Sequence, residues 1–163
     1  MSETTIRAAL PEDINSMDRL LRELAKTLGE PEAYGGDAGA LRDYGFGDRP
    51  VYHTRLAERD GTVVGLCVYF PEFSTWRCQP GLYVQDLFVD RHCRGTGIGQ
   101  RLLAAAIRDA ADAWHAGYLR LAVHVINNDA REFYGAHGFT DDRDNLVMLL
   151  SGDAFRAMTE QYQ

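Results

Sequence analysis

The residues best suited to binding a ligand form one glycine-rich stretch, Arg94-Gly95-Thr96-Gly97-Ile98-Gly99-Gln100. Glycine lets backbone N–H groups approach a bound anion closely, and the start of a helix adds amides that have no intrahelical acceptor. Arg91, Arg94 and Arg101 place three cations around this stretch in an otherwise acidic chain. The pattern predicts a loop that binds a diphosphate, although the glycines could also serve only as a tight turn between a strand and a helix.

Two common nucleotide-binding loops do not fit this stretch. A P-loop requires Gly-Lys-Ser/Thr, which is missing, and a dinucleotide-binding fingerprint requires a third glycine where Gln100 stands. The strands predicted before the loop form a hairpin, whereas dinucleotide-binding folds place a strand-helix-strand unit there. Both classes of nucleotide-binding protein are therefore excluded.

The elements that must position this loop alternate along the chain. Strands are predicted where β-branched and aromatic residues gather, at residues 5–8, 51–58, 63–70, 81–89 and 118–125, with final strands at Phe139 and residues 146–150. Helices are predicted where apolar residues recur every three or four positions, at residues 14–28, 97–116 and 129–137, with a short helix at 38–44 and a last one from Ser151. Arg59-Asp60-Gly61 supplies a hairpin turn, and Gly117 is the expected stop of the long helix. This order predicts an α/β fold with a mixed (α+β), mostly antiparallel central sheet flanked by helices.

Composition narrows the class of protein. The chain has 163 residues, of which 45% are hydrophobic and 25% charged, so one globular domain over residues 1–163 is expected. No apolar run is long enough for a membrane helix, and the N-terminus lacks the pattern of a signal peptide, so a cytoplasmic protein is expected. The net charge of -7 argues against nucleic acid and anionic membranes as partners. Three scattered cysteines predict reduced thiols and no metal site.

The glycine-rich stretch also resembles a known family signature. Arg94-Gly95-Thr96-Gly97-Ile98-Gly99 is similar to the R/Q-x-x-G-x-G/A motif of the GNAT acyl-CoA N-acyltransferase superfamily, and Asn127, Phe133-Tyr134 and Gly138-Phe139 resemble its second half. Within the superfamily, the chain resembles the diamine (spermidine/spermine) N-acetyltransferases. The segments that carry this resemblance are Tyr44-Gly45-Phe46-Gly47, Tyr52-His53, Phe73-Ser74-Thr75-Trp76 and Tyr83-Val84-Gln85-Asp86-Leu87-Phe88-Val89.

The resemblance implies an enzyme that uses acetyl-CoA as acyl donor and no metal. It assigns the donor site to the backbone of one strand end, to the glycine-rich loop and to a second wall. The implied residues are Leu87, Phe88 and Val89; Arg94, Gly95, Thr96, Gly97, Ile98, Gly99 and Gln100; and Asn127, Asn128, Asp129 and Ala130. A β-bulge within residues 87–89 would free N–H groups for the oxyanion. Asn127 could equally be a helix cap.

The resemblance also implies how protons move. Tyr134 is the expected general acid for the departing thiolate, with a packed core tyrosine as the alternative. Relatives carry Glu where Gln85 stands, and an amide cannot take a proton from an ammonium group. The base therefore stays open between ordered water, His53 and Asp86, while Gln85 and Asp86 are expected to contact the substrate.

The acceptor is expected to be a primary amine of a small molecule. Thr27 and Leu28 stand where polyamine-binding relatives carry an aromatic and an acidic residue, so a shorter diamine, a lysine analogue or another primary amine is favoured over spermine. A protein or peptide N-acetyltransferase and a noncatalytic acyl-CoA-sensing domain remain the alternatives. The subfamily resemblance implies a homodimer.

Overall fold

The computed structural model describes residues 3–161 and divides the chain into two compact units, Met1–His124 and Val125–Gln163. Each unit is described by itself. The prediction of a single domain over residues 1–163 stays a prediction. Among the described residues, no helix is long and apolar enough to cross a membrane.

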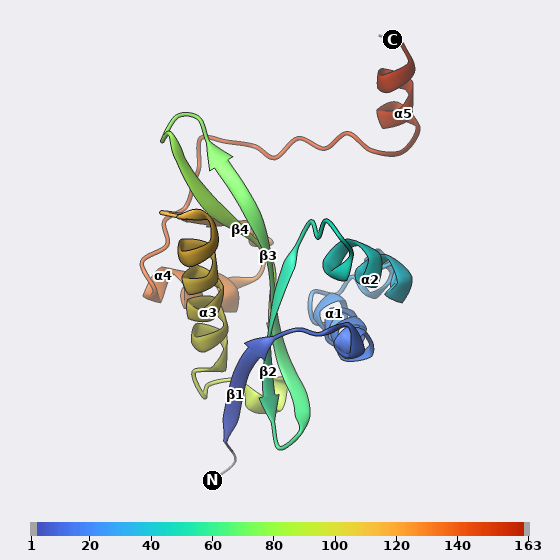
Figure 1. Cartoon of the computed structure of the whole chain (residues 1–163). Helices are drawn as coiled ribbons and strands as arrows, with labels where there is room; N and C mark the ends of the chain where they lie inside the picture. The colour runs from blue at the N-terminus through green and yellow to red at the C-terminus, as the bar shows by residue number, and fades with distance from the viewer. Residues whose placement is uncertain (1–2, 162–163) are drawn as a thin grey trace. The chain divides into compact units, whose positions relative to one another are not determined.

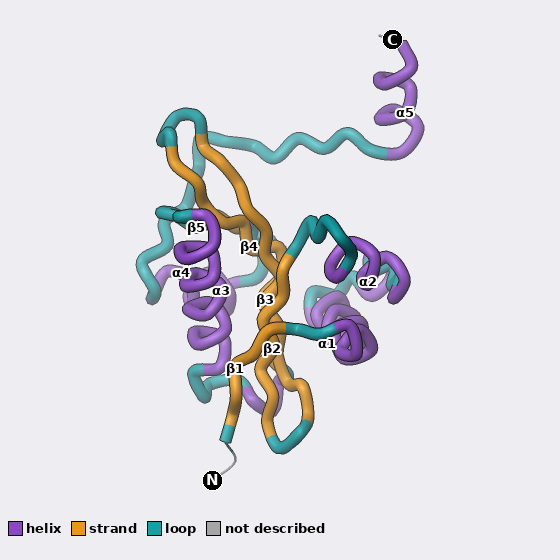
Figure 2. The backbone as a smooth tube through the Cα atoms, in the orientation of Figure 1, coloured by secondary structure: helices purple, strands orange, loops and turns teal. Residues whose placement is uncertain are grey.

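The first unit is built around a five-stranded sheet (Figures 1 and 2). Its strands follow the order of the chain: β1 (Thr4–Ala8), β2 (His53–Arg59), β3 (Thr62–Ser74), β4 (Gln79–Val89) and β5 (Leu119–Leu121). The pairs from β1 to β4 are antiparallel, and β4 and β5 are parallel. The predicted turn between β2 and β3 is present, with positive φ at Asp60 (50°) and Gly61 (73°). The predicted fold class is confirmed.

Helices cover both faces of this sheet. In Figure 1, α1 (Ile14–Thr27) and α2 (Ala38–Phe46) lie on one face, and α3 (Ile98–Trp114) lies on the other. Short 3-10 turns at Pro11–Asp13, Pro31–Ala33 and Arg91–Cys93 connect the elements. The sheet therefore separates an α1/α2 side from an α3 side.

The core lies on both sides of the sheet because the helices bury the apolar faces that their periodicity predicts. On the α1/α2 side the buried cluster is made by one face of α1 and by inward residues of three strands, namely Ile14, Met17, Leu20, Leu21, Leu56, Val63, Leu66, Val68 and Phe88. On the other side, Leu102, Ala106 and Ala110 of α3 are fully buried. Gly65 allows this close packing, because an added Cβ would lie 3.2 Å from a Leu102 methyl carbon.

An ion-pair network ties β1 to the start of α1. The Asp13 carboxylate accepts hydrogen bonds from the Leu10 backbone N–H (2.8 Å) and from both terminal nitrogens of Arg7 (2.7 and 2.8 Å). Arg7 also donates through Nε to Glu58 of β2 at 2.8 Å. The bond from Arg7 holds the pKa of Asp13 below its usual value, although burial opposes that shift. These bonds fix where α1 leaves the sheet.

The second unit contains α4 (Asn128–Ala136) and α5 (Gly152–Gln161). The Asn127 side chain accepts a hydrogen bond from the Ala130 N–H at 3.2 Å, so it caps α4, as the cap alternative expected. The strands expected at Phe139 and residues 146–150 are not formed, and Leu146, Val147, Met148 and Leu149 are 85–89% exposed. A strand needs a hydrogen-bonded neighbour, and the described part of this unit offers none.

Candidate active site

Strand β4 leads into the glycine-rich loop, and one of its edges is open near that end. On the β5 side, pairing stops at Val84, which faces Leu121. Within the described residues, no strand pairs with β4 on this side from Gln85 to Val89. Such an edge presents backbone N–H and C=O groups that an extended ligand can pair with.

A β-bulge in β4 falls at Gln85, which corrects the expectation of a bulge within residues 87–89. Asp86 pairs with Val68 and Val84 pairs with Tyr69, so Gln85 has no partner on β3. Leu87, Phe88 and Val89 continue a regular ladder with β3. The extra residue interrupts the alternation of side chains, so that Gln85 and Asp86 line the same cavity instead of opposite faces.

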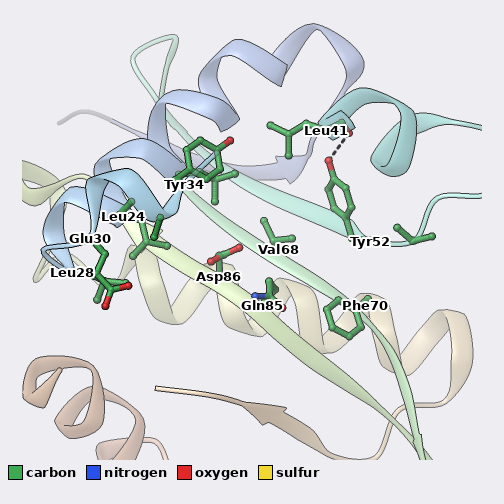
Figure 3. A pocket seen from close by; sticks show the side chains of 14 residues that line it. Leu24, Leu28, Glu30, Tyr34, Leu41, Tyr52, Val68, Phe70, Gln85 and Asp86 are labelled. Atoms are coloured by element: carbon green, nitrogen blue, oxygen red, sulfur yellow. Dashed lines mark hydrogen bonds between the residues drawn. The ribbon is translucent and has the colours of Figure 1, made fainter. Parts of the chain in front are cut away.

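This cavity, called the α1/α2 cavity below, lies between the sheet and helices α1 and α2 and has a volume of about 770 Å³ (Figure 3). Its walls come from α1, from the segment after it, from α2 and from strands β3 and β4, and include Leu24, Leu28, Tyr34, Leu41, Tyr52 and Phe70. Sequence reasoning assigned these positions to two helices, a loop and two strands. It singled out Tyr52 and Leu28 in comparison with relatives, but it did not bring the six together, because only the fold does so.

Asp86 is the carboxyl group that the sheet places in this cavity. Burial raises its pKa to about 6. Within the described residues, neither Asp86 nor Gln85 has a side-chain hydrogen bond, so both polar groups are available to a ligand. A carboxylate in an apolar cavity attracts an ammonium group strongly, because little water competes for it.

His53 lies on the other side of the sheet from this carboxyl. Its ring stacks on the Trp114 ring, with the two ring centroids 5.6 Å apart, and its centroid lies 5.7 Å from that of the Tyr69 ring. These residues line a separate cavity of about 540 Å³ beside α3, together with Asp109. Burial lowers the pKa of His53, which favours the neutral form of its ring. Of the two side chains considered as base, only Asp86 lies in the α1/α2 cavity.

The glycine-rich loop has the backbone that its glycines predict. Gly95 and Gly97 have φ of 73° and 78°, and an added Cβ at either position would meet nothing within 4 Å. Gly97 is the N-cap of α3. Within the described residues, the N–H groups of residues 95–100 have no acceptor, and the first helical bond of this end runs from Arg101 to Gly97. The loop therefore presents free amides to open space at a helix N-terminus.

Two of the three arginines around the loop donate hydrogen bonds to backbone carbonyls of this chain. Arg94 donates through Nε to the Val89 carbonyl at 2.9 Å, and its guanidinium lies 5.3 Å from the centre of the Phe88 ring. Arg101 donates to the Thr4 carbonyl at 2.7 Å. Arg94 thus fastens the loop to the end of β4.

The other predicted site residues belong to the second unit. Asn127 is the cap of α4, while Asn128, Asp129 and Ala130 form the first turn of this helix. Tyr134 lies in the same helix, and the centroid of its ring is 5.2 Å from that of Phe133 and 5.1 Å from that of Phe139. The roles assigned to these residues stay predictions.

The fold of the first unit, with the open edge of β4 beside a glycine-rich helix start, is shared with solved acetyltransferases. A solved aminoglycoside acetyltransferase from an uncultured soil metagenomic sample has the same fold, with a TM-score of 0.75, 16% identity and coverage of 92% of this chain and 97% of the other. Residues 17–139 match the model of the Acetyltransferase (GNAT) family. The chain belongs to this family and is an N-acetyltransferase.

Curated relatives agree with this membership. Thialysine N-epsilon-acetyltransferase of Bos taurus is 34% identical over 169 residues, which cover 97% of this chain and 98% of the relative. Aminoalkylphosphonate N-acetyltransferase of Salmonella typhimurium is 33% identical over 146 residues, with 89% and 90% coverage. The predicted resemblance is confirmed for the superfamily, and further relatives named for spermidine and spermine agree with the diamine acetyltransferase subfamily.

Proposed function

We propose that this enzyme transfers the acetyl group of acetyl-CoA to the primary amine of a small molecule bound in the α1/α2 cavity. The observation that carries the proposal is the position of Asp86, a half-buried carboxyl without a hydrogen-bond partner among the described residues, on the strand whose open edge continues toward the glycine-rich loop. One strand thus serves an amine site and a donor site. The relatives named above are N-acetyltransferases of amines, which supports the same reaction class.

The donor site fits acetyl-CoA at two places. The free amides of Gly95, Thr96, Gly97, Ile98, Gly99 and Gln100 suit its diphosphate. The open edge at Leu87, Phe88 and Val89 suits its pantetheine amides and the thioester oxygen. Asn127, Asn128, Asp129 and Ala130 are proposed as the second wall. When bound, acetyl-CoA supplies an acyl group activated as a thioester.

The chain's own residues must move two protons. The reaction forms a C–N bond and breaks a C–S bond. The ammonium nitrogen loses a first proton before it attacks, which is released through the base, and a second proton as the amide forms, which balances the proton that the thiolate sulfur gains. An alkylammonium has a pKa of about 10.4 and is almost fully protonated at neutral pH. Asp86 binds this ammonium and accepts its proton, directly or through water, because Gln85 cannot and His53 lies in the other cavity. Tyr134 is the proposed donor of the proton that the sulfur gains.

The first test is acetyl-CoA turnover, measured by thiol release, on diamines, polyamines, lysine analogues, aminoglycosides, simple alkylamines and short peptides. We expect turnover on small amines and none on peptides. Turnover on peptides alone would favour a protein acetyltransferase. Tight binding of acetyl-CoA without turnover on any acceptor would favour a noncatalytic sensing domain.

The role of Tyr134 has its own test. Tyr134→Phe should lower kcat by roughly 100-fold to 10,000-fold, because a general acid contributes about that factor. The affinity for acetyl-CoA should not change. Tyr44→Phe is the control, since Tyr44 is exposed on α2 and lies outside the α1/α2 cavity. An unchanged kcat in Tyr134→Phe would remove this tyrosine from the mechanism.

The homodimer and the cytoplasmic location also stay predictions. The dimer rests on the subfamily resemblance, and sedimentation of the purified protein would test it. The location rests on composition, and fractionation of source cells would test it.

A further inference from the structure

We propose that the acceptor is an amine with an apolar body and no carboxylate, of the alkylamine or arylalkylamine class. This inference rests on the proposed function, because it specifies which molecule occupies the α1/α2 cavity. Four features of the cavity support it. The walls are mostly apolar, the two tyrosine hydroxyls already donate hydrogen bonds within the protein, the charged lining residues are acidic, and the Asp86 carboxyl lies in the middle of the cavity.

The walls of the α1/α2 cavity are mostly hydrocarbon. Nine of its fourteen lining residues have wholly apolar side chains, and these include Leu24 and Leu28 from the end of α1 and Phe70 from β3. Thr27 and Leu28 stand where polyamine-binding relatives are expected to carry an aromatic and an acidic residue. A ligand that fills this space therefore gains most of its affinity from apolar contact.

The two phenols of the cavity offer no free hydroxyl proton to a ligand. The Tyr34 hydroxyl donates to the Asp18 carboxylate at 3.0 Å. The Tyr52 hydroxyl donates to the Leu41 carbonyl, a bond that Figure 3 marks with a dashed line. Each hydroxyl proton is thus engaged within the protein. These residues add aromatic surface to the cavity more than hydrogen-bonding capacity.

The charged side chains that line the α1/α2 cavity are both acidic. Asp86 lies in its middle, and Glu30 lies at its rim, where it pairs with His124 at 3.6 Å. No lysine, arginine or histidine belongs to the lining. A carboxylate or phosphonate on the ligand would lose water, would find no cation in the walls and would face two carboxyl groups. The relatives whose names refer to thialysine and aminoalkylphosphonate act on amines that also carry such an acid, so their selectivity should differ from that of this enzyme.

The test compares three acceptors of matched length: hexylamine, 1,5-diaminopentane and 5-aminopentanoate. We expect kcat/KM for hexylamine to exceed that for 5-aminopentanoate by at least about 100-fold, the difference that an unpaired buried charge produces. The diamine is the reference acceptor for the variants described next. From propylamine to hexylamine, KM should fall roughly fourfold with each methylene, the factor that corresponds to about 0.8 kcal/mol per buried CH₂. A kcat/KM for 5-aminopentanoate equal to that for hexylamine would overturn the proposal.

A matched pair of variants locates the selectivity in the cavity. Leu28→Glu places a carboxylate in the lining and should shift the preference toward 1,5-diaminopentane by at least about tenfold. Thr27→Glu adds the same charge one residue earlier, on an exposed position outside the lining, and should leave the preference unchanged. Equal shifts in both variants would mean that overall charge, and not the cavity wall, selects the acceptor.

Binding measured without turnover separates this inference from the proposed function. Hexylamine should raise the melting temperature of the enzyme more than 5-aminopentanoate at equal concentration, because only the first fits the apolar walls. Stabilisation by hexylamine without acetylation of any amine would support the cavity assignment and overturn the proposed reaction. Acetylation of amino acids in preference to alkylamines would keep the reaction and overturn the apolar acceptor.

Discussion

At the scale of single residues, Asp86 combines a cost in stability with a gain in binding. A half-buried carboxyl without a hydrogen bond destabilises the folded protein when it is charged, and its pKa of about 6 expresses that cost. The same lack of partners leaves it free for an ammonium ligand. We expect such a group to be retained because of the ligand that it binds.

Asp86→Asn should therefore weaken activity and strengthen the fold. Loss of the charge-assisted bond should lower kcat/KM for the amine by roughly 10-fold to 100-fold. Because the folded-state pKa lies above the ordinary value, the cost of the charge is fully present above pH 6 and disappears as the pH falls toward 4. The variant should thus gain about 1–2 kcal/mol in free energy of unfolding at pH 7.5 and nothing at pH 4.

Denaturant titrations at the two pH values, together with a pH profile of kcat/KM, check this prediction. In the wild type, kcat/KM should fall as the pH drops through about 6, because Asp86 becomes neutral. The variant should lack that limb. Asp13→Asn is a useful contrast, because the pKa of Asp13 is lowered and its effect on stability should have the opposite sign.

At the scale of elements, the join from β4 through the loop to α3 forms the donor site. Gly97→Ala should cost about 1 kcal/mol in stability, because positive φ is strained for alanine, and should weaken binding of CoA at least about tenfold by filling the open space at the helix start. Gly61→Ala is a matched control, with φ of 73° and equally open space in the β2–β3 turn. It should lose similar stability without loss of CoA affinity by calorimetry. Equal affinities in the two variants would contradict the loop assignment.

The link between β1 and α1 predicts sensitivity to acid. Asp13→Asn removes the charge that accepts two bonds from Arg7, so it should cost about 1.5–3 kcal/mol at pH 7. Because the folded-state pKa of Asp13 is lowered, this contribution is present above the ordinary value near 4 and is lost as the pH falls below it. Glu23→Gln, which breaks an exposed pair with Lys26, should cost less than about 0.5 kcal/mol. Urea titrations that gave equal costs would contradict the prediction.

The elements also mark how far sequence reasoning reaches. The apolar period of α1 and the turn at Gly61 are local signals, and both appear in the structure where they were predicted. The predicted stop of α3 at Gly117 was wrong. The helix ends at Trp114, and the left-handed residue that follows it is His115, while Gly117 donates its N–H to the Pro80 carbonyl. The bulge at Gln85 and the α1/α2 cavity depend on strand register and on helix packing, which local patterns do not encode.

At the scale of the first unit, the two faces of the sheet carry different kinds of side chain. The α1/α2 side holds an apolar cavity with an unpaired carboxyl. The α3 side holds polar groups that satisfy each other, since Asp109 accepts hydrogen bonds from both Arg55 and Tyr69. The sequence made His53 a candidate base. Because side chains alternate between the two faces of a strand, His53 points to the α3 side and does not share the cavity with Asp86.

The open edge of β4 beyond Val84 also bears on solubility. Unpaired backbone groups along a strand edge are a template for strands of other molecules, and within the described residues no strand pairs with this edge. We expect the enzyme without CoA to self-associate on mild warming, as measured by light scattering, and CoA to suppress this. Inorganic pyrophosphate, which resembles only the diphosphate, should not protect. Bound CoA would then pair with the same backbone groups of β4 that otherwise allow the enzyme to aggregate.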